Sequence, residues 1–185
     1  MSHLTPIKTV FLYSAAALAI AAFQGCGSGT ASGKKNNSNQ ALNEAGIKKQ
    51  FMAANQQLLQ KENDEMDSYA RNHKLNFVNT ASGVRYFVYK PSAKGDSIRT
   101  GMEVTLDFVV SLLDGTECYS SARDGQKTFL VGQEEAESGI HKGLQYLKRG
   151  DKAILLIPSP LAHGLLGDFK KIPPQMPIVY DLQVH

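Results

Sequence analysis

The last hundred residues alternate short strand-like segments with turns, and this pattern constrains the fold of the 185-residue chain more than any other feature. The segments are rich in Val, Ile, Tyr, Phe and Thr, which favour β-strands. Turns such as Asp114-Gly115 and Gly150-Asp151 separate them. The expected strands are GVRYFVYK (83–90), MEVTLDFVVSLL (102–113), KTFLVG (127–132), DKAILLIPS (151–159) and PIVYDLQVH (177–185).

One helix is predicted among these strands, over residues 139–148. Ile140, Leu144 and Leu147 recur on one helical face, and Ser138 precedes them as a candidate N-cap. His141 is expected on the opposite, solvated face. A single helix lying across a mostly antiparallel sheet indicates an α+β domain.

A second helix is predicted over residues 41–72, which lack Pro and are dominated by Ala, Leu, Gln, Glu, Lys and Met. This helix either packs on its own domain or serves as a dimerisation surface, and the sequence leaves both possibilities open. Its apolar stripe comprises Ala45, Phe51, Met52, Leu58, Leu59, Met66 and Tyr69.

The N-terminus resembles a targeting signal. Thr9–Phe23 is uncharged and shorter than the roughly 20 residues that span a bilayer, as in a secretory signal peptide. The following Gly25-Cys26 pair is similar to a bacterial lipoprotein signal, which predicts cleavage after residue 25 and acylation of Cys26. Plain secretion or an uncleaved anchor is the alternative. Residues 26–40 are expected to form a flexible tether. The protein is thus expected in the cell envelope, periplasmic or outer-membrane associated, with Cys26 as its membrane anchor.

Composition argues against several other functions. The 20 Lys and Arg residues are offset by 17 Asp and Glu residues, so no nucleic-acid partner is expected. The five His residues show no metal-ligand spacing, and no metal site is expected. Two Cys residues cannot form a disulfide-rich scaffold.

Three ordered segments of the C-terminal part carry a family resemblance. They are LLDGTECYSS (112–121), FLVGQEEAESGIHKGLQYLKRGDKAILLIPSPLAHG (129–164) and GDFKKIPPQMPIVYDLQV (167–184). With the entry strand ASGVRYFVYK (81–90), they resemble the FKBP family of peptidyl-prolyl cis-trans isomerases over residues 82–185. The helical segment 41–75 and the lipoprotein signal are similar to a gliding-motility-associated subgroup of Bacteroidetes envelope lipoproteins. The resemblance implies an antiparallel sheet wrapped around one short helix, preceded by an N-terminal amphipathic helix.

The resemblance also implies which residues form the site, and that no cofactor takes part. Several of these residues depart from the family pattern: Cys118-Tyr119 replaces Phe-Asp, Ile140 replaces Trp, His163 replaces Tyr, and Glu137 replaces an apolar residue. The catalytic candidates are Phe108, Tyr119, Glu137, Ile140, His163 and Tyr180, and the substrate-binding candidates are Cys118, Phe129, Ala136 and Ile172.

The expected function is isomerisation of X–Pro bonds in exported proteins, by desolvation and twisting of the amide in an apolar pocket. The alternative is a peptide-binding or chaperone module of the envelope that does not catalyse rotation. A further possibility is a thiolate on Cys118 activated by His163. Proline-containing segments of exported proteins are the expected partners, and residues 41–72 are a candidate homodimer contact.

Overall fold

The structure is a computed structural model that describes residues 37–133 and 136–185, with side chains from residue 43 onward. The predicted signal segment, Cys26 and most of the tether lie outside the described residues. The elements in chain order are α1 (Asn37–His73), β1 (Val78–Asn79), β2 (Arg85–Lys90), β3 (Glu103–Leu112), β4 (Glu117–Ser120), α2 (Ser121–Asp124), β5 (Lys127–Leu130), α3 (Ser138–Leu144), β6 (Lys152–Ile157), η1 (Ser159–Leu161) and β7 (Ile178–Val184).

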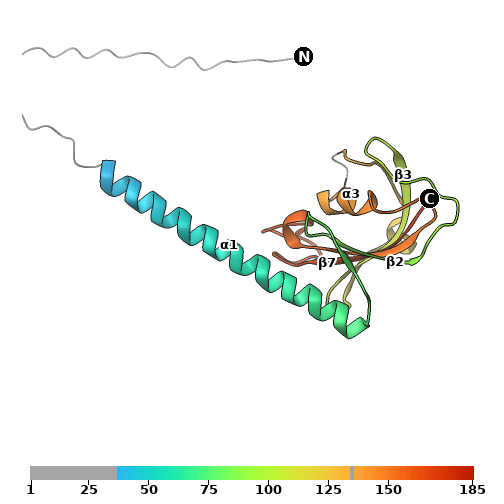
Figure 1. Cartoon of the computed structure of the whole chain (residues 1–185), viewed down its shortest axis with the longest axis horizontal. Helices are drawn as coiled ribbons and strands as arrows, with labels where there is room; N and C mark the ends of the chain where they lie inside the picture. The colour runs from blue at the N-terminus through green and yellow to red at the C-terminus, as the bar shows by residue number, and fades with distance from the viewer. Residues whose placement is uncertain (1–36, 134–135) are drawn as a thin grey trace, which may run out of the picture. The chain divides into compact units, whose positions relative to one another are not determined.

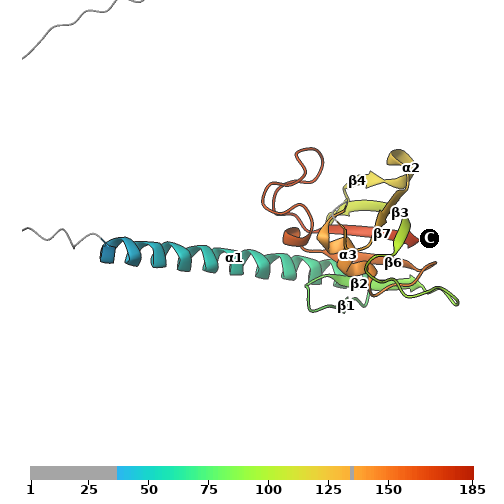
Figure 2. The same ribbon diagram turned by 90° about the horizontal axis from the view of Figure 1, so that it is seen from above.

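The strands of the described residues form one antiparallel sheet in the order β1-β2-β6-β7-β3-β4 (Figure 1). The ten-residue strand β3 pairs with β7 along one edge. On its other edge it pairs with β5 near its start and with β4 near its end. The short helix α2 lies between β4 and β5 in the chain, and Figure 2 shows it next to β4. This division opens the edge of the sheet beside Phe108 of β3.

Helix α3 covers one face of the sheet, and its approach to β6 depends on two glycines. A Cβ atom on Gly139 would lie 2.2 Å from Ile157 Cγ2, and one on Gly143 would lie 2.5 Å from Leu155 Cδ1. Neither distance is possible for a real side chain, so glycine at both positions permits the contact. Ile140 and Leu144 of α3 are then buried in the main core with Leu155.

Helix α1 packs on the opposite face of the same strands. Successive residues of a strand point to opposite faces. Leu155 faces the main core under α3, whereas Leu156 belongs to a second cluster with Val179 and Met66 of α1. Arg85 of β2 also forms an ion pair with Asp67 of α1. Strands β6 and β7 are therefore covered on both faces, which explains their nearly continuous apolar sequence.

The packing of α1 on the sheet begins at Glu62. From residue 43 to residue 61 its side chains are exposed, apart from the half-buried Leu58. Phe51 and Met52 are 67% and 63% exposed. Of the two possibilities for this helix, packing on its own domain accounts only for its C-terminal third. Within the described residues, no helix combines the length and the apolar character needed to cross a membrane.

The fold class predicted from the sequence is confirmed, and each of the five predicted strands is present within a few residues of its expected bounds. Strands β1 and β4 were not predicted, because segments of two and four residues are too short to show a strand pattern in the sequence. The expectation for His141 was wrong. It is 7% exposed, its Nδ1 accepts a hydrogen bond from the Gly132 N–H (3.0 Å), and its ring meets Phe129 edge-on. The segment after β5 encloses the side of α3 that the helical pattern assigned to solvent.

Gly139→Ala is expected to destabilise the protein by about 2 kcal/mol, because the new methyl group overpacks the contact with Ile157 and the Leu161 carbonyl. Urea denaturation followed by circular dichroism measures the change. Gly46→Ala is the matched control. Its Cβ would meet nothing within 4 Å, so a gain in stability of up to about 1 kcal/mol is expected from helix propensity. A Gly139→Ala protein as stable as the wild type would contradict the packing argument.

Candidate functional site

A cavity of about 290 Å³ opens at the edge of the sheet where β4 and β5 separate. Strand β3 forms one wall of the cavity, and the region from β4 to β5 forms a second wall. The residue before α3 and the segment after η1 form the other sides. The lining residues are Phe108, Tyr119, Asp124, Lys127, Glu137, His163, Asp168 and Lys170.

Aromatic and aliphatic side chains form the inner part of this site. Phe108 of β3 and Tyr180 of β7 lie with ring centroids 6.2 Å apart, tilted by 47°. Both are buried in the main core, and Ile140 of α3 is buried in the same cluster. These residues come from three elements far apart in the sequence, and the antiparallel β3–β7 pairing brings the two rings together.

The Glu137 carboxylate connects this apolar base with His163. The Tyr180 hydroxyl donates a hydrogen bond to Glu137 Oε2 (3.0 Å), and His163 Nε2 lies 3.1 Å from Glu137 Oε1. The Glu137 side chain is only 13% exposed. Burial, together with the charge of Glu137 and the hydrogen bond to it, raises the pKa of Tyr180 well above 10. Tyr180 is therefore a neutral donor throughout the physiological range.

A second acid, Asp168, lies beside Tyr119. Asp168 Oδ1 accepts hydrogen bonds from the backbone N–H groups of Lys170, Lys171 and Ile172 (2.8–2.9 Å), and Oδ2 accepts one from the Tyr119 hydroxyl. Burial alone would raise the pKa of Asp168, but these hydrogen bonds outweigh it and lower the pKa to about 2. The hydrogen bond to Asp168, followed by burial, raises the pKa of Tyr119 to about 12. The pair thus consists of an ionised carboxylate and a neutral phenol.

Lysine side chains lie over both lining rings. Lys127 Nζ is 5.3 Å from the centroid of Phe108. Lys171 Nζ is 4.8 Å from the centroid of Tyr119 and also donates to the Cys118 carbonyl (2.7 Å). Such cation–π contacts hold an ammonium group over a ring face without a carboxylate partner. The lining therefore differs from the apolar pocket expected from the sequence, since seven of its eight residues are ionisable and only Phe108 is not.

The structure separates the ten predicted site residues into two groups. Phe108, Tyr119, Glu137 and His163 line the cavity directly. The other six lie in or against the core around it: Cys118, Phe129, Ala136, Ile140, Ile172 and Tyr180. The predicted lipidation residue Cys26 is outside the described residues.

The geometry of Cys118 argues against an activated thiolate. Its Sγ lies 3.7 Å from the Thr116 carbonyl and 3.6 Å from the Lys171 carbonyl, as a thiol donor. Burial raises the pKa of the Cys118 thiol, with a smaller contribution from the charge of Asp168. His163 faces Glu137 instead. A Cys118–His163 nucleophile is therefore not formed in this structure.

Sequence reasoning missed four lining residues: Asp124, Lys127, Asp168 and Lys170. Asp168 had a local signal, because an Asp that follows Gly in a loop commonly accepts the N–H groups two to four residues later. Its proximity to Tyr119, 49 residues earlier, depends on the tertiary fold. Lys127 lies over Phe108 because β5 pairs with the start of β3, a tertiary contact that the sequence did not predict.

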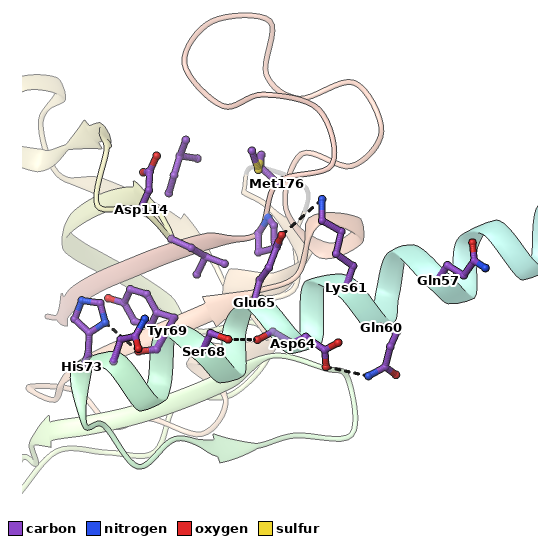
Figure 3. Close-up of a pocket in the computed structure, with 14 residues that line it drawn as sticks. Gln57, Gln60, Lys61, Asp64, Glu65, Ser68, Tyr69, His73, Asp114 and Met176 are labelled. Atoms are coloured by element: carbon purple, nitrogen blue, oxygen red, sulfur yellow. Dashed lines mark hydrogen bonds and ion pairs between the residues drawn. The ribbon is translucent and has the colours of Figure 1, made fainter.

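A larger groove of about 760 Å³ lies elsewhere, between the C-terminal half of α1 and the residues that follow β3 and precede β7 (Figure 3). None of the ten predicted site residues lines it. Several of its polar side chains already bond within the helix, including Gln60 with Asp64 and Lys61 with Glu65. Across residues 37–133 and 136–185, no group of three or more His, Cys, Asp or Glu side chains is arranged to hold a metal ion.

Sequence comparison matches residues 95–185 to the family described as FKBP-type peptidyl-prolyl cis-trans isomerase. An FKBP-type isomerase, FkpA of Buchnera aphidicola, is 32% identical over 106 residues, covering 57% of this chain and 41% of the relative. A probable FkpA of Neisseria meningitidis is 36% identical over 106 residues, covering 57% and 38%. The chain therefore spans about two fifths of the length of these relatives.

Structural comparison identifies the same fold. The crystal structure of FkpA from Escherichia coli has a TM-score of 0.58 at 23% identity, covering 82% of this chain and 72% of that one. A peptidyl-prolyl cis-trans isomerase from Pseudomonas syringae has a TM-score of 0.59 at 25% identity, covering 70% and 92%. The antiparallel sheet, the short helix across it and the family match together show that residues 95–185 form a domain of the FKBP-type peptidyl-prolyl cis-trans isomerase family.

Proposed function

We propose that this protein is a prolyl isomerase that acts on X–Pro bonds of exported proteins. The observation that carries the proposal is the apolar base of the cavity, where Phe108, Ile140 and Tyr180 meet in a domain of this family. A cavity of about 290 Å³ accommodates a proline ring and the amide that precedes it.

The chemistry follows from amide resonance. Rotation about an X–Pro bond meets a barrier of about 18–20 kcal/mol, because twisting breaks the conjugation of nitrogen with the carbonyl. The planar amide is the more polar form and is better stabilised by water than the twisted one. A site that replaces water with the rings of Phe108 and Tyr180 therefore favours the transition state over the ground state. Each tenfold increase in rate requires about 1.4 kcal/mol of this differential stabilisation.

Two polar features of the cavity are proposed to orient the substrate. By the family resemblance, the backbone N–H of Glu137 is proposed to donate to the substrate carbonyl, and His163 is proposed to act as a hydrogen-bond donor in place of the family's tyrosine. Asp168 is proposed to supply the carboxylate that the family has at the position of Tyr119. Asp168 would act through Tyr119, because the hydrogen bond from the Tyr119 hydroxyl to Asp168 Oδ2 holds that hydroxyl at the cavity wall.

A second candidate function is peptide binding without catalysis. The ionisable lining favours it, because Lys127 and Lys170 at the cavity bring charge and hydration to a site whose catalysis depends on excluding water. Such a module would hold proline-containing or apolar segments and leave the rate of amide rotation unchanged. The first experiment below separates the two functions.

The envelope location and the oligomeric state extend the same proposal. Export followed by acylation of Cys26 would anchor the domain at a membrane through the tether 26–40, and two or more acyl chains hold a protein there stably. The exposed apolar residues of α1, Phe51 and Met52 among them, support a homodimer contact within residues 41–72.

Phe108→Ala is expected to lower kcat/KM for a short X–Pro peptide at least about tenfold, since it removes a ring that displaces water from the amide. Protease-free exchange NMR on the purified full-length chain measures the rate. Phe51→Ala, which removes an exposed ring of α1, should leave the rate within about twofold of the wild type. If wild type and both variants match the uncatalysed rate while the peptide still binds, the isomerase proposal fails and the binding module stands.

Asp168→Asn is expected to lower the pKa of Tyr119 from about 12 towards 10, because the hydrogen bond to the carboxylate is the largest cause of the increase. Asparagine Oδ1 can still accept the three backbone N–H groups, so the loop should remain folded. Asp124→Asn, at the same cavity, is the control and should lower this pKa less, because the charge of Asp124 contributes less to the increase than the hydrogen bond to Asp168 does. Tyrosine Cζ resonances followed during pH titration report the change, and a Tyr119 that still titrates near 12 would contradict the assignment.

The same pair predicts the direction of a pH effect on stability. The folded-state pKa of Asp168, about 2, lies below the ordinary value of roughly 3.9. The stabilisation from Asp168 is therefore fully present above pH ~4 and is lost as the pH falls through about 2. Acid denaturation should show this loss in the wild type and a smaller one in Asp168→Asn.

Cys26→Ala is expected to abolish incorporation of a labelled fatty acid and to release the protein from the membrane fraction of bacterial cells. Cys118→Ala is the matched control, because Cys118 is buried in the core and should not be acylated. Labelling that persists in Cys26→Ala would rule out the lipoprotein proposal.

A further inference from the structure

Glu62 of α1 is an unusual residue for the interior of this protein. It is 1% exposed and lies on the helix face that packs against the sheet, one turn before Met66. A carboxylate in such a place costs several kcal/mol in lost hydration unless hydrogen bonds compensate for it. An apolar side chain would cover the sheet without that cost, as Met66 does, so packing alone does not account for an acid here.

Both carboxylate oxygens of Glu62 bond to one residue. The backbone N–H of Ser159 donates to Oε2 (2.9 Å), and the Ser159 hydroxyl donates to Oε1. These two residues are 97 positions apart, and Ser159 is itself 2% exposed. The bonds join α1, which precedes the family-matched segment, to the first residue of η1 inside it.

Ser159 in turn holds the residues on both sides of His163. Its carbonyl accepts hydrogen bonds from the N–H of Ala162 (3.0 Å) and from the N–H of Gly164 (2.8 Å). His163 therefore sits in a short turn whose two flanking amides both bond to the residue that Glu62 holds. From this turn its Nε2 reaches to 3.1 Å from Glu137 Oε1 at the cavity.

We propose that Glu62 is a positioning residue for the isomerase site, fixing the turn 159–164 and hence the place of His163 beside Glu137. Helix α1 is then part of the site's support and not merely a spacer between the tether and the domain. The proposal rests on the proposed function, because it assigns a role in X–Pro isomerisation. A displacement of about 1 Å at a catalytic centre is enough to cost roughly a hundredfold in rate.

The test compares Glu62→Ala, Glu62→Gln and Met66→Ala in the full-length chain, at a temperature where all are folded. Glu62→Ala removes both hydrogen bonds and should lower kcat/KM about tenfold. This loss is smaller than the roughly hundredfold loss that a displacement of about 1 Å can cause. Glu62→Gln should restore most of the activity, since its carbonyl accepts the Ser159 N–H and its amide donates to the hydroxyl. Met66→Ala weakens the packing of α1 one turn away without touching Ser159, and should change kcat/KM less than about twofold.

Two readouts do not depend on catalysis. The imidazole NMR signals of His163 should shift, and the Gly164 amide should exchange with solvent at least about tenfold faster, in Glu62→Ala but not in Met66→Ala. Equal effects of Glu62→Ala and Met66→Ala on these signals would overturn the positioning role. A shift of the His163 signals in Glu62→Ala with unchanged kcat/KM, in a protein whose wild type is active, would overturn it as well. A wild type with no isomerase activity would remove the proposed function, and the NMR and exchange data would still decide whether Glu62 positions His163.

Discussion

The close approach of α3 to β6 is the contact on which the rest of this domain depends. Gly139 and Gly143 lie one turn apart on α3, and a Cβ atom at either would come within 2.5 Å of a β6 side chain. The short distance buries Ile140 deeply enough to lie in the same core as Phe108 and Tyr180. It also places Glu137, the residue before the helix, within hydrogen-bonding distance of the Tyr180 hydroxyl. The apolar base of the cavity thus depends on glycine at these two positions of α3.

The cavity combines an apolar base with an unusually charged lining, and the two are reconciled by hydrogen bonding. Glu137 is bonded by Tyr180 and adjacent to His163, while Asp168 accepts four donors. Carboxylates held in this way need less water than free ones, because protein donors replace the lost hydration. The buried base of the cavity is therefore apolar, whereas the charged groups lie in the lining above it.

Helix α1 gives the sheet a covering on its second face, but only along part of its length. From Glu62 onward it contributes buried and hydrogen-bonded side chains, including Met66 and Asp67. Before that point its apolar residues are exposed. A single helix therefore presents two kinds of surface: its last third packs on the sheet, whereas the described side chains before Glu62 are exposed apart from Leu58.

The sequence by itself determined the class of fold, because strand-forming composition, turn residues and one short helical face are local properties that neighbouring residues express directly. It also pointed to Phe108, Tyr119, Glu137 and His163, which line the cavity, although only through resemblance to a family. Tertiary structure alone decided the burial of His141, the pairing of Tyr119 with Asp168, and the bond from Glu62 to Ser159. The last two join residues 49 and 97 positions apart, and the first depends on how the segment after β5 folds back over α3. Hydrophobic periodicity indicates which face of a helix or strand is apolar, but it does not indicate which polar residue of another segment contacts that element in the folded protein.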